Sequence, residues 1–142
     1  MIQGGMNYNS VPDKAEFTVD VRTVPGMDHN LVQTELEKTL GNAVAVERFV
    51  DMPPIETSAE DPFVAAVQTA ATRVLGKEAG STSLGMPYFS DASIFKPMLH
   101  CPVVILGPGN PSAAHQTDEW CDINNIAGAT AIYSELISDW CS

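Results

Sequence analysis

The sequence predicts a chain of the α/β or α+β class, built in two unequal parts. Residues 14–21 and 44–50 alternate apolar and polar side chains, which is typical of half-buried strands. Asp28, Asp61 and Asp122 each precede an apolar stripe with helical spacing, which predicts capped helices. The 142 residues are 44% hydrophobic and 18% charged, a balance that is typical of a folded domain.

The first part is expected to begin with a hairpin. Residues 4–12 form an extended segment and a turn before the strand at 14–21. One face of that strand carries Ala15, Phe17, Val19 and Val21. Asp28 then caps a helix that ends at Gly41, with an apolar stripe formed by Leu31, Val32, Leu36 and Leu40.

A domain boundary is expected at the Pro53-Pro54 step, which breaks the pattern after the strand at 44–50. This places residues 1–54 in one domain and residues 55–142 in another.

The second part is expected to alternate helices with a strand. Asp61 and Pro62 start a helix that closes at Gly76, with a buried face formed by Phe63, Val64, Val67, Ala71, Val74 and Leu75. Ser90-Asp91 caps a short helix that ends before Pro97, and a buried strand occupies 102–106. The helix after Asp122 is expected to turn inward Ile123, Ile126, Thr130, Tyr133 and Ile137.

Charge and composition exclude several classes of partner. The net charge is −11, from 18 acidic and 7 basic side chains, which argues against nucleic acid and anionic membrane as partners. No apolar run is long enough to span a membrane, and no signal peptide is expected, because no basic start followed by an apolar core occurs. The odd number of cysteines, three, indicates reduced thiols, so we expect a cytoplasmic protein. The lack of a CxxC pair argues against a structural zinc site.

The segment at 107–120 is the strongest candidate for a functional loop. It follows the expected strand at 102–106 and presents His115 among small residues. Loops at the carboxyl ends of strands hold ligands and metals in α/β folds, and neutral imidazole suits zinc. A histidine with a structural or solvent-facing role remains the alternative at this stage.

Three stretches in this order resemble the M20 metallopeptidase family. They are GGMNYNSVPDKAEFTVDVRTVPG at 4–26, GMPYFSDASIF at 85–95 and GPGNPSAAHQTDEW at 107–120. The nearest resemblance is to the acetylornithine deacetylase and succinyl-diaminopimelate desuccinylase group. It implies an α+β lid remnant followed by the C-terminal part of an α/β zinc-peptidase catalytic domain.

The resemblance assigns four residues and no catalytic one. His115 matches the family's final zinc ligand, and Asn9 and Ser90 match positions near the substrate. Arg22 would bind the substrate carboxylate, with a surface salt bridge to Asp20 as the alternative. We expect Glu119 to anchor the loop, with a role as a base as the alternative.

Much of the family's zinc site has no counterpart here, because neither its His-x-Asp motif nor its Glu-Glu pair occurs. We therefore expect a C-terminal fragment that is inactive alone, binds zinc only in the complete enzyme, and acts on a small N-acyl amino acid when an N-terminal chain complements it. One alternative is a non-catalytic homodimerising module with an exposed strand edge. Another is a small metal-binding protein that also uses His100, the Asp118/Glu119 pair or His29, which is otherwise expected to face solvent.

Overall fold

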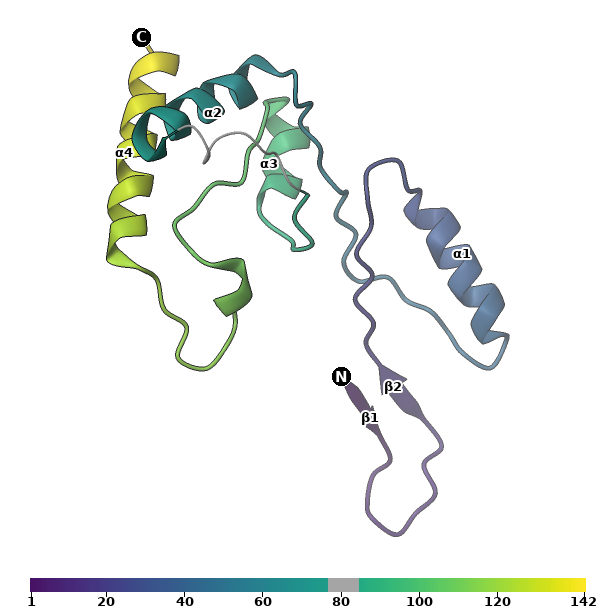
Figure 1. Ribbon diagram of the computed structural model, residues 1–142. Coiled ribbons are helices and arrows are strands. Elements are labelled where there is room, and N and C mark those ends of the chain that lie inside the picture. Colours follow the sequence, from purple (N-terminus) through teal and green to yellow (C-terminus); the bar gives the residue numbers. More distant parts are fainter. Residues whose placement is uncertain (77–84) are drawn as a thin grey trace. The chain divides into compact units, whose positions relative to one another are not determined.

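The computed structural model describes residues 1–76 and 85–142 and divides into two compact units, Met1–Arg48 and Phe49–Ser142 (Figure 1). The described residues form four α-helices and one two-stranded sheet, which confirms a mixed α and β chain of α+β character. The assignment of 1–54 and 55–142 to separate domains remains a prediction.

The first unit opens with the expected hairpin. Strands β1 (Ile2–Gly4) and β2 (Ala15–Phe17) pair antiparallel, with Ile2 opposite Phe17. The strand expected over 14–21 is shorter than predicted, because no described strand pairs with the residues beyond Thr18, whose N–H donates to the Met1 carbonyl at 2.9 Å. Every residue of this two-stranded sheet is exposed.

Helix α1 (His29–Leu40) confirms the expected start and end. The Asp28 carboxylate accepts the Asn30 N–H at 2.8 Å, and Gly41 adopts the positive φ of 74° that terminates many helices. Residues 44–50 form no strand, contrary to the prediction, because no described strand lies alongside them to pair. Instead, the Arg48 guanidinium donates to the Gln33 side-chain oxygen at 2.7 Å, which ties this segment to α1.

The second unit is built on two long helices whose starts are also confirmed. Helix α2 (Pro62–Leu75) begins where the Asp61 carboxylate accepts the Phe63 N–H at 2.8 Å. Helix α4 (Ile123–Trp140) begins with the same contact between Asp122 and the Asn124 N–H, also at 2.8 Å.

Helices α2 and α4 pack against each other and form the core of the second unit (Figure 1). Ala70, Ala71 and Ile132 are its buried centre. The aromatic rings of Phe63 and Trp140 meet edge to face, with centroids 5.1 Å apart. Other packed side chains at the centre are Val74, Leu106 and Leu136.

One ion-pair network also joins these helices. The Arg73 guanidinium lies 2.5 Å from an Asp139 oxygen and 3.4 Å from a Glu135 oxygen. The Arg73 pKa is raised, mainly because of its hydrogen bond to Asp139. These side chains are about half exposed, so the network stabilises the helix pair only weakly.

The buried face of α4 differs from the predicted one. The five residues expected to face inward are exposed, whereas Ala129 and Ile132 are buried. Helix α4 carries apolar side chains on more than one face, so spacing alone could not select the face that α2 covers. On α2 the prediction was right for Val64, Val67 and Ala71 and wrong for Leu75, which is exposed.

Helix α3 (Ala92–Leu99) and the segment after it depart from prediction. The helix continues through Pro97 and ends at His100, because the His100 N–H donates to the Lys96 carbonyl at 2.9 Å. Asp91 occupies the cap position but makes no side-chain capping bond.

Residues 102–106 pair with side chains instead of forming the expected strand. The Thr57 hydroxyl bonds both the N–H and the carbonyl of Val103, at 3.0 and 2.7 Å. The Tyr133 hydroxyl donates to the Leu106 carbonyl at 2.6 Å. No neighbouring strand lies within the described residues, so these hydroxyls satisfy backbone groups that a sheet would otherwise pair.

Substituting Ile132→Ala should destabilise the second unit, because Ile132 is 2% exposed at the α2–α4 centre. We expect a loss of about 2–4 kcal/mol in the free energy of unfolding, measured by urea denaturation. Ile137→Ala is the matched control on the same helix, since Ile137 is 61% exposed. Equal losses in both variants would contradict the observed core.

Substituting Tyr133→Phe removes the hydroxyl that holds the Leu106 carbonyl and should cost about 0.5–1.5 kcal/mol in the same assay. Tyr88→Phe is the control, because Tyr88 is 43% exposed against 40% for Tyr133 and its hydroxyl bonds no described group. If both changes were neutral, the Tyr133 bond would contribute nothing to stability.

Candidate functional site

His115 lies on a loop between a short 3₁₀ helix, η1 (Pro111–Ala113), and α4. The Asn110 side chain starts η1 by accepting the Ser112 N–H at 3.0 Å. His115 follows with a positive φ of 61° and an exposed side chain. Its imidazole makes no hydrogen bond to any described residue.

The backbone of this loop is fixed at its tip by Glu119. One Glu119 carboxylate oxygen accepts the His115 N–H at 3.0 Å, which confirms the expected loop anchor. The Gln116 side chain also donates to the Ser112 carbonyl at 2.6 Å and closes the turn.

The start of the loop is held by helix α4. The Asn125 side chain donates to the Pro108 carbonyl at 3.3 Å, and the Cys121 thiol approaches the same oxygen at 3.4 Å. Tyr133 holds the Leu106 carbonyl two residues earlier. The loop that carries His115 is therefore bonded to a helix that belongs to the core.

The donor chemistry around His115 fits one metal ligand and no more. A free imidazole is a good zinc ligand, but catalytic zinc sites need at least three protein ligands. Residues 1–76 and 85–142 contain no group of three or more His, Cys, Asp or Glu side chains that could hold a metal ion. The assignment of His115 as a zinc ligand remains a prediction.

Ser90 belongs to the same unit and lies just before α3. It is half-buried, and its carbonyl accepts the Ser93 N–H at 3.1 Å. Its hydroxyl bonds no described group. The structure shows no hydrogen bond between Ser90 and the His115 loop, and its predicted substrate contact stays a prediction.

Arg22 and Asn9 lie in the first unit. The Arg22 guanidinium donates to Asp20 through Nε at 3.1 Å and through one terminal nitrogen at 2.6 Å. This is the surface salt bridge that the sequence analysis gave as the alternative to substrate binding. Asn9 is exposed, and its backbone N–H donates to the Asn7 side chain at 3.3 Å.

His29 differs from the expectation that it faces solvent. It is half-buried, and its Nε2 lies 2.9 Å from the Thr23 hydroxyl. His29 is the first residue of α1, and this contact joins the start of the helix to the segment before it.

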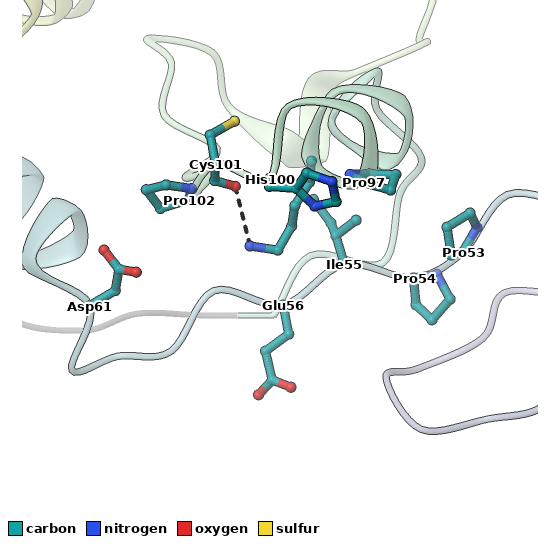
Figure 2. A pocket seen from close by; sticks show the side chains of 10 residues that line it. Pro53, Pro54, Ile55, Glu56, Asp61, Pro97, His100, Cys101 and Pro102 are labelled. Carbon is teal, nitrogen blue, oxygen red and sulfur yellow. Dashed lines mark hydrogen bonds between the residues drawn. The ribbon is translucent and has the colours of Figure 1, made fainter.

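A hollow in the second unit was not foreseen from the sequence (Figure 2). Its volume is about 540 Å³, and Lys96, one of the residues that line it, donates to the Thr57 hydroxyl and the Cys101 carbonyl. Figure 2 shows Glu56 pointing away from His100 and Cys101, so the lining groups do not converge on one point. Four prolines line its wall, namely Pro53, Pro54, Pro97 and Pro102. These prolines are the feature of the sequence from which the hollow could have been suspected.

Within the described residues, no helix combines the length and apolarity that a membrane crossing requires.

A sequence profile of the peptidase family M20/M25/M40 matches residues 3–139. A probable succinyl-diaminopimelate desuccinylase of Staphylococcus aureus is 28% identical over 140 residues, which cover 94% of this chain and 35% of that protein. An acetylornithine deacetylase of Photorhabdus laumondii is 27% identical over 148 residues, which cover 99% and 36%. No solved structure gives a significant match.

The chain thus spans about a third of the length of the curated relatives that it matches. The profile match confirms the resemblance found in the sequence, and members of this family are generally metal-dependent hydrolases. The chain belongs to the peptidase family M20/M25/M40.

Proposed function

We propose that this chain supplies one zinc ligand and part of the substrate site of an M20-type deacylase acting on a small N-acyl amino acid such as N-acetylornithine. The family match over residues 3–139, with a free imidazole at His115 in its third motif, is the observation that carries the proposal. Relatives of both deacylase kinds are about equally similar. The Met86-Pro87-Tyr88-Phe89 run favours the deacetylase.

Each assigned side chain has a separate task in this proposal. Zinc, when bound, polarises the amide carbonyl and stabilises the charge that develops on its oxygen. His115 binds as neutral imidazole, and Arg22 leaves Asp20 to clamp the substrate carboxylate with two hydrogen bonds. Asn9 and Ser90 bond the substrate's polar groups.

The chain alone is proposed to lack amidohydrolase activity, because one imidazole cannot hold a catalytic zinc. A second polypeptide segment, such as an N-terminal M20 chain, would supply the other ligands and the general base. The described cysteines are free thiols, which supports a reducing compartment such as the cytoplasm.

Zinc content and hydrolysis of N-acetylornithine test this proposal together. We expect the purified chain to retain less than stoichiometric zinc and to show no turnover. Adding the part of the Photorhabdus deacetylase that this chain does not match should raise both. His115→Ala should abolish the gain, whereas His100→Asn, a change at another exposed histidine of the same unit, should not.

Two results would count against the proposal. Turnover by the isolated chain would show that the site is complete within it. Zinc retained at the wild-type level by His115→Ala, measured by elemental analysis, would remove His115 from the ligand set.

A second function, a homodimerising module, is favoured by the exposed hairpin. Among the described residues β1 and β2 each have one unpaired edge, and Ile2 is 78% exposed. An unpaired strand edge with apolar side chains is a template for pairing with a second copy. This role needs neither zinc nor a complementing chain.

Light scattering after size-exclusion chromatography tests the module. We expect a dimer that Ile2→Lys shifts toward monomer, because a charged side chain on an edge strand opposes pairing. Met6→Lys is the control, since Met6 is 91% exposed in the turn of the same hairpin and outside the strands. A monomer at every concentration, or equal effects of both changes, would contradict pairing through this edge.

A further inference from the structure

The backbone at His115 needs an explanation, because its φ of 61° lies in the left-handed region that residues other than glycine seldom adopt. Such a conformation persists only where surrounding contacts hold it. Two of the three described non-glycine residues with positive φ lie in this loop, the other being Asp118 at 62°. The turn that carries the imidazole therefore contains two residues with a left-handed backbone within four positions.

The contact that holds this turn comes from Glu119. Its carboxylate oxygen accepts the His115 N–H at 3.0 Å. The bond closes a ring around the strained residues and leaves the imidazole free. No described side chain other than Glu119 bonds the His115 backbone.

We propose that Glu119 is a positioning residue for His115, which it holds through the backbone in the orientation that presents the imidazole to a metal. The inference rests on the proposed function of His115 as a ligand. Glu119 acts as a hydrogen-bond acceptor at a fixed distance, so its reach matters and its charge does not. A metal ligand or general base at this position would need the negative charge of the carboxylate.

Two substitutions separate these requirements. Glu119→Gln keeps the side-chain length and an acceptor oxygen while it removes the charge. Glu119→Asp keeps the charge and withdraws the carboxylate by one methylene. Asp118→Asn is the control, because it removes the neighbouring charge and asparagine tolerates a left-handed backbone.

The first measurement is amide hydrogen exchange at His115 in the metal-free chain, followed by NMR. Glu119→Asp should exchange about fivefold faster than wild type, because the bond to the amide is lost. Glu119→Gln and Asp118→Asn should stay near wild type. Equal exchange in all four proteins, or acceleration in Glu119→Gln alone, would overturn the inference.

The second measurement is the zinc dissociation constant of the complemented complex. Glu119→Asp should weaken zinc binding about tenfold, as loss of contacts that orient a ligand generally does. Glu119→Gln should bind like wild type, and a loss there would identify the charge as the requirement and overturn the inference.

The two measurements also separate the inference from the function on which it rests. If His115→Ala leaves zinc unchanged while Glu119→Asp accelerates amide exchange, the proposed ligand is wrong and the backbone contact stands. If His115→Ala loses zinc while Glu119→Asp matches wild type in both assays, the ligand stands and the positioning role is wrong.

Discussion

Close packing of α2 against α4 is the constraint on which the second unit depends. Alanines at its centre let the helices approach, and a Cβ placed on Gly128 would lie only 3.3 Å from the Leu75 side chain. Because α2 fixes α4, the side chains on α4 can hold distant backbone groups. Tyr133 and Asn125 donate to the carbonyls of Leu106 and Pro108, so hydrogen bonds from α4 hold the start of the His115 loop.

What the sequence could predict was local. The starts of α1, α2 and α4 were found because each depends on an aspartate that caps an amide two residues later. Glu119 was expected to anchor its loop for a similar reason, since its partner lies four residues away. The identities of the candidate ligands came from ordered motifs, whose match to the M20 family covers almost the whole chain.

What the sequence could not predict depends on distant partners. Alternation at 44–50 and an apolar run at 102–106 are compatible with strands, but a strand forms only where another strand pairs with it. Thr57 bonds Val103, 46 positions away in the sequence, and Tyr133 bonds Leu106, 27 positions away. Periodicity and capping motifs relate residues only a few positions apart, so they do not predict such contacts. The prediction of the buried face of α4 was wrong for the same reason, because that face is decided by how α2 packs against it.

The side chains proposed to bind a metal and a substrate carboxylate are held in different ways, and the difference has a physical consequence. His115 is held through its backbone N–H, so the bond to Glu119 need not break when the imidazole binds a metal. Among the described residues, Asp20 alone holds Arg22, and both side chains are at least half exposed. An exposed pair of this kind contributes at most about 1 kcal/mol, because water screens it. A substrate carboxylate that offers two oxygens to the guanidinium can therefore replace Asp20 at little cost, and Asp20 holds Arg22 in place until then.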